Sequence, residues 1–276
     1  MSYKAKKRLS GTAVYVVCII MTFLVLFPFF LVILTSVKSV EEAAIVDLTL
    51  PREILWENFS YVIEQGKLIR AFGNSILITG ITVLLTVLIS SVTAFVLTRR
   101  SDRFSKILTN YFLIGMIAPL SLIPEVIIVK MLGLSGTYLA IILIHVAVRM
   151  PLSIMIYSGI IQGIPRSLDE SAMLEGCGFF RMFFNVIFPL LKPAIFTNII
   201  IVFMGVWNDF QVSLYFVTDI AKNTVPLSIY SFVGYMTYKW NYVCAFIVLS
   251  ILPILIVYCF AQKYIVDGMI AGAVKN

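Results

Sequence analysis

The sequence predicts an all-α membrane protein with six transmembrane helices. Hydrophobic residues make up 61% of the 276 residues and charged residues only 13%, whereas a soluble domain is about 45–50% apolar. The apolar residues gather in runs long enough to cross a bilayer, which takes about 20 residues. A polar stretch, residues 163–192, separates two of these runs and carries helix start and stop signals of its own.

Six apolar runs qualify as transmembrane helices: 12–36, 72–98, 107–131, 137–162, 193–216 and 242–264. The first follows a basic start and exceeds the core of a signal peptide, so we expect an uncleaved span. Pro119 and Pro124 interrupt the third run. Because helix breakers are tolerated where neighbouring helices satisfy the backbone, we expect a packed bundle rather than isolated spans.

The distribution of lysine and arginine predicts the orientation of the chain. With the N-terminus in the cytoplasm, 13 of the 21 basic residues lie in inner segments and 7 in outer ones, with Arg149 inside a span. Basic residues favour the cytoplasmic side of a membrane. Both termini and the 163–192 loop are therefore expected in the cytoplasm.

A short helix is expected within the 163–192 loop, over Leu168–Glu175. Ser167 and Glu170 have the spacing of a capping box, in which the serine side chain bonds a backbone N–H and the glutamate reaches back. Gly176, followed by Gly178, is typical of a helix stop. Two turns are too short to be stable alone in water, so the helix must be held by packing.

The surface of this short helix favours a protein partner. Ser171 and Ala172 are small enough to let a partner approach the helix backbone closely. The alternative is a helix resting on lipid headgroups, but an anionic leaflet would repel its three acidic residues. The amphipathic run Phe179–Phe188 would then carry movement of the helix into the membrane spans.

The loop resembles the EAA loop of ABC importer permeases. Glu170-Ser171-Ala172, three residues, Gly176, nine residues and Val186-Ile187-Phe188-Pro189 correspond to the family form Glu-Ala-Ala, three, Gly, nine, Ile-x-Leu-Pro. This sequence departs from that form at Ser171, Val186 and Phe188, which are mild changes in size. The Glu, Gly and Pro positions are intact, and the spacing holds over 20 residues.

Two further segments narrow the resemblance to carbohydrate-type permeases. Trp207-Asn208-Asp209-Phe210 is similar to their Trp-Asn-Glu/Asp-Phe segment, and the ending from Gln262 to Lys275 is similar to their Gly-rich tail. The resemblance runs nearly end to end. It is closest to the smaller permease of the maltose importer.

This resemblance implies a type I ABC importer permease fold with six spans, five of them in the conserved core, and a cytoplasmic coupling helix. It implies a multi-pass protein of the bacterial cytoplasmic membrane that couples ATPase closure to alternating access for a sugar or oligosaccharide. The implied partners are a second permease in a heterodimer, two ATPase subunits, an extracytoplasmic sugar-binding protein and membrane lipids. The expected division is 1–70 for the tail, first helix and outer segment, 71–264 for the permease core, and 265–276 for a cytoplasmic tail.

The candidate site residues fall into three groups, and no catalytic, cofactor or metal site is expected. ATPase coupling is assigned to Ser167, Glu170, Ser171, Ala172, Gly176 and Pro189. A C-terminal ATPase contact is assigned to Asp267, Gly268, Gly272 and Lys275, because the tail is too polar and Gly-rich to end a span. Trp207, Asn208 and Asp209, expected near the middle of the fifth span, are translocation-path candidates, since sugar sites combine aromatic faces with planar polar groups. The alternative for these three is a polar knot that holds the two permeases together.

Other charged residues lie within or near the spans, where ionisable groups usually line a cavity or have a partner. Glu125 and Lys130 are expected near the outer end of the third span, in solvent. His145 and Arg149 are four residues apart and share a helical face, which favours structural hydrogen bonding over a proton relay.

Other functional classes are less consistent with the sequence. A secondary transporter or channel would favour an intramembrane relay or repeated broken helices, and a membrane enzyme would need a metal or nucleophile grouping that is not seen. The chain has no Gly-Lys-Ser/Thr phosphate loop, so ATP and Mg²⁺ would be bound by a partner ATPase. The scattered basic residues argue against nucleic acid, and the four cysteines have no paired spacing. A permease for a non-sugar solute is the nearest alternative within ABC importers.

Overall fold

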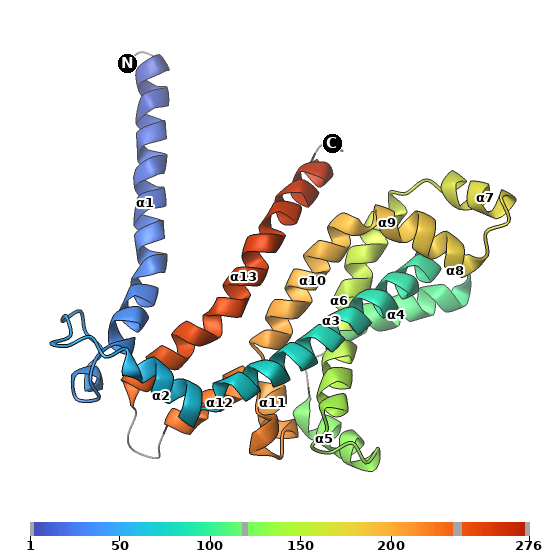
Figure 1. Ribbon diagram of the computed structural model, residues 1–276. Coiled ribbons are helices and arrows are strands. Elements are labelled where there is room, and N and C mark those ends of the chain that lie inside the picture. Colours follow the sequence, from blue (N-terminus) through green and yellow to red (C-terminus); the bar gives the residue numbers. More distant parts are fainter. Residues whose placement is uncertain (1–2, 118–120, 234–238, 274–276) are drawn as a thin grey trace. The chain divides into compact units, whose positions relative to one another are not determined.

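A computed structural model describes the backbone of residues 3–117, 121–233 and 239–273, and the side chains from residue 14 to residue 259 within those ranges. Helices dominate the described chain (Figure 1), which confirms that the fold is all-α. The α-helices are α1 (Tyr3–Ser36), α2 (Glu57–Gln65), α3 (Leu68–Arg99), α4 (Arg103–Ile117), α5 (Leu122–Met131), α6 (Tyr138–Gln162), α7 (Ser167–Leu174), α8 (Phe179–Met182), α9 (Phe188–Leu190), α10 (Lys192–Trp207), α11 (Gln211–Phe216), α12 (Val225–Ser228) and α13 (Trp240–Ala273).

The chain divides into two compact units. One contains Met1–Leu68 and Ser228–Leu252, and the other contains Ile69–Leu227 and Pro253–Asn276. In the first unit, the side chains of α1 from Val14 to Phe30 are exposed. A helix that is apolar all round is stable only where lipid or another apolar surface surrounds it, so α1 has the character of a membrane span.

Four helices of the described chain are long and apolar enough to cross a membrane: Val14–Ser36, Leu68–Arg99, Tyr138–Gln162 and Trp240–Cys259. Two further candidates are bent pairs, α4 with α5 at 119° and Phe179–Leu190 with α10 at 80°. The number of spans is therefore four, or up to six if each bent pair counts as one. The third run is interrupted, as its prolines predicted, whereas the break in the fifth run was not predicted.

The third expected span, 107–131, is divided between α4 and α5. Pro124 lies in the first turn of α5, where a missing backbone N–H leaves no intrahelical bond unmade. Pro119, the other expected breaker, lies outside the described residues. The last expected span also differs from the prediction, because α13 continues beyond residue 264 to Ala273.

The fifth expected span, 193–216, ends early at Trp207. The side-chain amide of Asn208 donates to the carbonyl of Met204 at 2.9 Å, which occupies an acceptor at the end of α10. The carboxylate of Asp209 accepts from the backbone N–H of Val212 at 2.8 Å, in the first turn of α11. Short polar side chains of this kind compete with the helical backbone and favour helix ends, so this pair separates two helices.

The second unit contains two hydrophobic clusters. One joins α3 and α6 to the 163–192 loop and includes Phe95, Tyr157, Phe183 and Ile187. The other joins α3, α5, α6, α10 and α11 and includes Ile141, Val202 and Phe216. Since α3, α6 and α10 contribute to both clusters, they form the framework that places the loop.

Helix α3 buries a row of hydroxyl residues along one face. These small side chains are Ser75, Thr79, Thr82, Thr86 and Ser90, and small residues let membrane helices approach closely. Near the start of α3, the Asn74 amide donates to the carbonyls of Ala221 at 3.0 Å and Asn223 at 2.9 Å. The Ser75 hydroxyl accepts from the N–H of Val225 at 2.9 Å, so this end of α3 holds the segment before α12.

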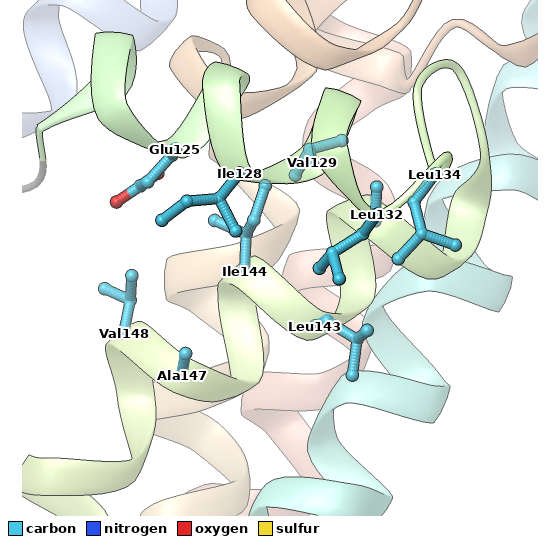
Figure 2. A pocket seen from close by; sticks show the side chains of 10 residues that line it. Glu125, Ile128, Val129, Leu132, Leu134, Leu143, Ile144, Ala147 and Val148 are labelled. Carbon is cyan, nitrogen blue, oxygen red and sulfur yellow. The ribbon is translucent and has the colours of Figure 1, made fainter.

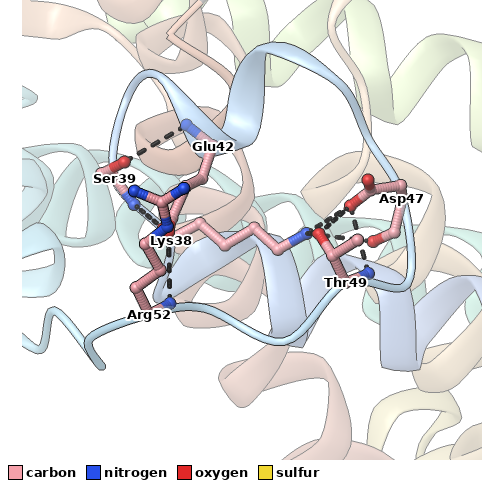
Figure 3. A network of polar contacts seen from close by, with 6 residues as sticks. All are labelled: Lys38, Ser39, Glu42, Asp47, Thr49 and Arg52. Carbon is pink, nitrogen blue, oxygen red and sulfur yellow. Dashed lines mark hydrogen bonds and ion pairs between the residues drawn. The ribbon is translucent and has the colours of Figure 1, made fainter.

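In the first unit, a buried lysine organises the segment after α1 (Figure 3). Lys38 is fully buried, and its Nζ lies 2.7 Å from Asp47 Oδ1 and 3.3 Å from Thr49 Oγ1. Ser39 and Glu42 form reciprocal bonds, in which each backbone N–H donates to the other side chain at 3.2 Å. This capping box stabilises the turn that brings Asp47 back to Lys38.

The Lys38–Asp47 pair predicts how stability depends on pH. The Lys38 ammonium and the Thr49 hydroxyl lower the pKa of Asp47 from 3.8 to about 2. A lowered pKa stabilises the fold fully above pH 3.8, and the stabilisation is lost as pH falls through about 2. Asp47→Asn should therefore lower Tm at pH 7 by a few degrees, and the difference from the wild type should vanish near pH 2.

Thermal unfolding of the purified protein in detergent measures this difference. Glu53→Gln is the control, because Glu53 makes none of these bonds and its loss should leave Tm unchanged. Equal melting temperatures of wild type and Asp47→Asn at pH 7 would contradict the stabilising role of the pair.

Candidate functional site

The 163–192 loop is largely helical. It contains α7 and then a continuous helical stretch made of α8, a π-helical turn over Phe183–Ile187, and α9. The expected short helix, Leu168–Glu175, is found within one residue of its predicted bounds as Ser167–Leu174. Figure 1 shows α7 beyond the ends of α6 and α10, connected to α8 by a short turn.

The start of α7 differs from the prediction. Arg166, the residue before the helix, already has helical angles of φ −65° and ψ −24°, and no described side chain caps this end. The helix therefore already includes Ser167. A capping side chain requires extended backbone at its own position, so Ser167 and Glu170 do not form the expected capping box. The carbonyl of Pro165 instead accepts from Leu168, and that of Arg166 accepts from Asp169 and Glu170. The reciprocal bonds of a capping box occur at Ser39 and Glu42, where the same sequence spacing is present.

The end of α7 agrees with the prediction. Gly176 has φ +79°, the left-handed conformation that favours glycine. Its N–H donates to the Met173 carbonyl, and the Cys177 N–H donates to the Ala172 carbonyl, both at 3.0 Å. These two bonds form a Schellman motif, so Gly176 sets the direction in which the chain leaves α7.

Helix α7 presents one face to its own chain and another to its surroundings. Asp169 and Ala172 are buried, and Ala172 packs in the cluster that contains Met182 and Phe183. Helical spacing thus turns Ala172 toward the chain's own core, whereas its expected contact with a partner stays a prediction. The exposed side chains of α7 and of the turn after it include Glu170, Ser171, Met173, Leu174 and Glu175.

Leu174 is a candidate contact residue that the sequence analysis did not single out. It is 90% exposed at the end of α7, and Met173 beside it is 59% exposed. Large apolar side chains at this exposure, among acidic neighbours, are typical of a surface that a protein partner covers. The signal was present in the sequence as two apolar residues between the acids and the glycine.

Pro189 lies in the helical stretch that follows α7. The N–H of Phe188 donates to the carbonyl of Phe183, five residues back, and Pro189 has no N–H to continue the ordinary pattern. A π-helical turn accommodates this position, and such turns are frequent at functional sites. Phe183 and Ile187 are buried in the same cluster as Ala172, so the stretch connects α7 to the helices of the second unit.

A charged pair that the sequence analysis did not anticipate joins α3 to α7. Arg99 Nε lies 2.6 Å from Asp169 Oδ2, with the two side chains 14% and 10% exposed. Among the described residues this Nε makes no hydrogen bond, but Arg99 Nη2 donates to Asp169 Oδ1 at 3.4 Å, so the ion pair also includes a long hydrogen bond. Arg99 Nη2 donates to the Ile164 carbonyl at 3.1 Å. The sequence showed Arg99 only as a basic residue at a span end and Asp169 only as an acid in a first helical turn.

The structure separates the three translocation-path candidates. Trp207 is buried, with its ring 5.5 Å from Phe203 and 6.1 Å from Phe72 between centroids. In this structure Trp207 is thus a packing residue rather than part of a cavity wall. Asn208 and Asp209 line an open hollow of about 580 Å³, together with Met204, Gly205, Phe210, Gln211, Leu214 and Tyr215.

The charged residues of α6 have a structural role. Arg149 Nη2 donates to the Gly205 carbonyl at 2.7 Å, which ties α6 to the end of α10. His145 Nε2 lies 4.0 Å from Asp209 Oδ1, beyond hydrogen-bond distance. The spacing of His145 and Arg149 favoured structural hydrogen bonding over a proton relay, and the Arg149 bond is of this structural kind. A Cβ at Gly205 would lie 2.6 Å from the Arg149 guanidinium, so the end of the Arg149 side chain would have to shift.

A second pocket of about 200 Å³ lies between α5 and α6 (Figure 2). Its lining is apolar except for Glu125, and includes Ile128, Leu143, Ile144 and Val148. Glu125 Oε2 is buried without a hydrogen-bond partner among the described residues. Glu125 as a whole is half-buried, whereas Lys130 is exposed as expected.

The C-terminal candidates lie in the last part of α13. Asp267, Gly268 and Gly272 belong to that helix, which ends at Ala273. Lys275 lies outside the described residues. The backbone thus continues as a helix where a separate tail was expected from residue 265.

Comparisons with known proteins give one consistent family. The model of a family described as "Binding-protein-dependent transport system inner membrane component" matches residues 86–270. The chain is 32% identical over 263 residues to a probable starch degradation products transport system permease protein, AmyC, of Thermoanaerobacterium thermosulfurigenes, covering 94% of each chain. It is 32% identical to the melibiose/raffinose/stachyose import permease protein MelC of Bacillus subtilis, covering 90% of this chain and 91% of that one.

Two further comparisons extend this result. The chain is 35% identical over 211 residues to the trehalose/maltose transport system permease protein MalG of Thermococcus litoralis, covering 74% of each. Among solved structures, it matches a chain of a bacterial ABC transporter involved in the import of the acidic polysaccharide alginate. The TM-score is 0.84 at 21% identity, covering 96% of this chain and 99% of that chain. At this identity the structural match establishes the fold alone.

Proposed function

Because this chain belongs to the family of binding-protein-dependent transport system inner membrane components, we propose that it is a permease subunit of an ATP-driven importer of sugars or oligosaccharides. Relatives named for a substrate are permeases for starch degradation products, for melibiose, raffinose and stachyose, and for trehalose and maltose. These names support a sugar as the substrate of this chain. The permease itself is not an enzyme in this proposal, and a partner ATPase binds ATP and Mg²⁺.

The observation that carries the coupling proposal is the two-faced helix α7. Its inner face packs through Ala172 into the core of the second unit, and its outer face exposes Glu170, Met173 and Leu174. An element held on one side by its own chain, with exposed apolar side chains among acidic ones on the other, is suited to sit in a partner's groove. We assign that groove to the ATPase subunit.

Magnitudes favour a seated helix over a single charge contact. Moving a two-state transporter from 99:1 to 1:99 takes about 5.5 kcal/mol of differential interaction. An exposed ion pair contributes only about 0–1 kcal/mol, so Glu170 alone cannot couple ATPase closure to the membrane helices. Burial of Leu174 and Met173 in a groove adds about 1.5–3 kcal/mol for each side chain, which would hold α7 firmly enough for ATPase closure to move it as a rigid body.

The wider assembly follows from the same proposal. The permease pairs with a second permease, and two ATPases bind the cytoplasmic side while a sugar-binding protein delivers substrate outside. One of the structural neighbours is a bacterial alginate ABC transporter in complex with a pentasaccharide-bound periplasmic protein, which supports a binding protein as partner. Both termini and α7 lie in the cytoplasm in this arrangement, and residues 71–264 form the permease core within a bacterial cytoplasmic membrane.

The hollow lined by Asn208 and Asp209 is the proposed part of the translocation path in this chain. Its lining combines amide and carboxylate groups with the aromatic rings of Phe210 and Tyr215, the chemistry that sugar hydroxyls and sugar faces require. Trp207 is left out of this proposal because it is buried.

Purification of the tagged chain from its host membranes tests the proposal. We expect an ATPase subunit and a second permease to co-purify, and the complex in vesicles to accumulate sugar only with ATP and the binding protein. A chain that is recovered alone and transports without ATP would be a secondary transporter or channel. A complex that moves only a non-sugar solute would refute the substrate class.

Truncation after Tyr264 should weaken ATPase recovery if α13 beyond that point contacts the ATPase, and unchanged recovery would contradict that contact.

A further inference from the structure

Arg99 and Asp169 connect α7 to a membrane helix at a point where the sequence suggests no connection. The ion pair is 2.6 Å long and nearly buried. Arg99 also donates to the carbonyl of Ile164, in the turn before α7. One side chain of α3 therefore holds both the helix and the turn that leads into it.

Aromatic packing reinforces this attachment from the same end of α3. The Phe95 ring lies 6.0 Å from the Arg99 guanidinium carbon, and its centroid is 5.5 Å from that of Phe183 and 5.8 Å from that of Phe179. Arg99 thus lies against a ring that also contacts α8 and the π-helical turn. The end of α3 is bound to both parts of the 163–192 loop.

The opposite end of α3 is attached to another segment. Asn74 and Ser75 bond the backbone of residues 221–225 through three hydrogen bonds of 2.9–3.0 Å. Helix α3 has 32 residues and contains no proline, so it spans about 48 Å at 1.5 Å per residue. A proline-free helix of this length lacks the commonest cause of a sharp kink.

We infer that Arg99 and Asp169 are positioning residues, which make α3 a direct link between α7 and the segment 221–225 at the far end of the helix. A displacement of α7 by the ATPase is passed to α3 through the ion pair, in addition to the route through Phe179–Phe188. The segment 221–225 then moves with α3 because Asn74 holds its carbonyls. This inference rests on the proposed function and adds a route by which the ATPase side communicates with the opposite end of the permease.

The ion pair suits this role because its two charges are held in a nearly closed site. Water screens an exposed pair strongly, but it screens a buried one much less. Loss of one partner leaves the other charge without a counter-charge in that site. The tilt of α7 relative to α3 therefore depends on the ion pair, whereas the end of α7 is fixed by the Schellman motif at Gly176.

The test uses the full importer in vesicles with Arg99→Gln, Asp169→Asn and the double variant. The measured quantity is the amount of sugar moved per ATP hydrolysed, together with recovery of the complex. We expect each single variant to assemble normally and to lower this ratio about tenfold, within the usual range of coupling between sites. The double variant should be no worse than either single variant, because the two residues act as one unit.

A neighbouring pair provides the matched control. Arg100 and Asp102 form an ion pair of 3.2 Å with side chains 63% and 41% exposed, so Arg100→Gln should leave the ratio unchanged. Asn74→Ala should lower the ratio without affecting ATPase recovery, because it removes the hydrogen bonds from α3 to the carbonyls of Ala221 and Asn223.

Three outcomes would overturn the inference. The first is a normal ratio of sugar moved per ATP hydrolysed in Arg99→Gln. The second is a loss in the double variant that equals the product of the two single losses, as for independent sites. The third is failure of Arg99→Gln to assemble, which would make the pair a folding determinant. A wild-type complex that moves no sugar with ATP would instead count against the proposed function itself.

Discussion

Replacement of Gly176 by valine is expected to abolish sugar uptake while the chain remains in the membrane. Gly176 has φ +79°, and a β-branched residue in that conformation is a strong outlier. No described atom lies within 4 Å of a Cβ built at this position, so the penalty comes from the backbone rather than from a clash. The left-handed conformation disfavours any L side chain by about 1–2 kcal/mol.

The consequence is large because α7 has only eight residues. A helix of two turns has little stability of its own, and loss of the Schellman bonds at Gly176 releases its last turn and the exit direction of the chain. The exposed face formed by Met173 and Leu174 would then no longer be presented in one orientation. Uptake of radiolabelled sugar by cells, with an immunoblot of the membrane fraction, measures both parts of the prediction.

Gly178 offers a matched control two residues away. It has φ −70° and ψ 164°, which a valine adopts readily, and a Cβ there also meets no described atom within 4 Å. Gly178→Val should therefore retain uptake. Gly176→Asn should retain more uptake than Gly176→Val, because asparagine tolerates the left-handed region. Normal uptake by Gly176→Val would refute the role of this turn.

Replacement of Ala172 by phenylalanine is the second change with a large expected effect. Ala172 is 7% exposed and lies in the cluster that contains Met182, Phe183 and Ile187. Insertion of a large side chain into a packed core destabilises it by about 1–3 kcal/mol. We expect Ala172→Phe to lower Tm of the isolated permease and to abolish uptake, because α7 is pushed away from the core that holds it.

Ser171→Phe distinguishes the two faces of α7. Ser171 is exposed, so its replacement should leave Tm of the isolated permease unchanged but reduce recovery of the ATPase. Thermal unfolding of the permease alone, followed by ATPase pull-down, separates the two effects. An unchanged Tm for Ala172→Phe with loss of the ATPase would mean that Ala172 contacts the partner, as the sequence alone suggested.

Local signals were reliable where they depend on neighbouring residues. The bounds of α7 and the stop at Gly176 were predicted because a glycine is the residue that adopts φ > 0 without strain. The membrane class followed from composition, since a chain with 61% hydrophobic residues cannot cover a globule with polar surface. The three acidic residues of this helix also favour a protein over a lipid surface as its partner, and that stays a prediction.

Predictions failed where backbone geometry or a distant residue decides the outcome. The spacing of Ser167 and Glu170 fits a capping box, but the helical angles at Arg166 prevent it, while the same spacing succeeds at Ser39 and Glu42. An apolar run that includes Asn208 and Asp209 looks continuous in sequence, yet these two side chains bond the backbone and divide it.

By itself, the sequence determined that this is a helical membrane protein with a family-specific loop, and where the short helix in that loop ends. Those features depend on contacts within a few residues, which composition and spacing report directly. Only the tertiary structure decided that Ala172 faces inward, that Trp207 is a packing residue, and that Arg99 meets Asp169 across 70 positions. The reason is physical: which face of a helix is buried, and which charge finds a partner, depend on elements far apart in the chain.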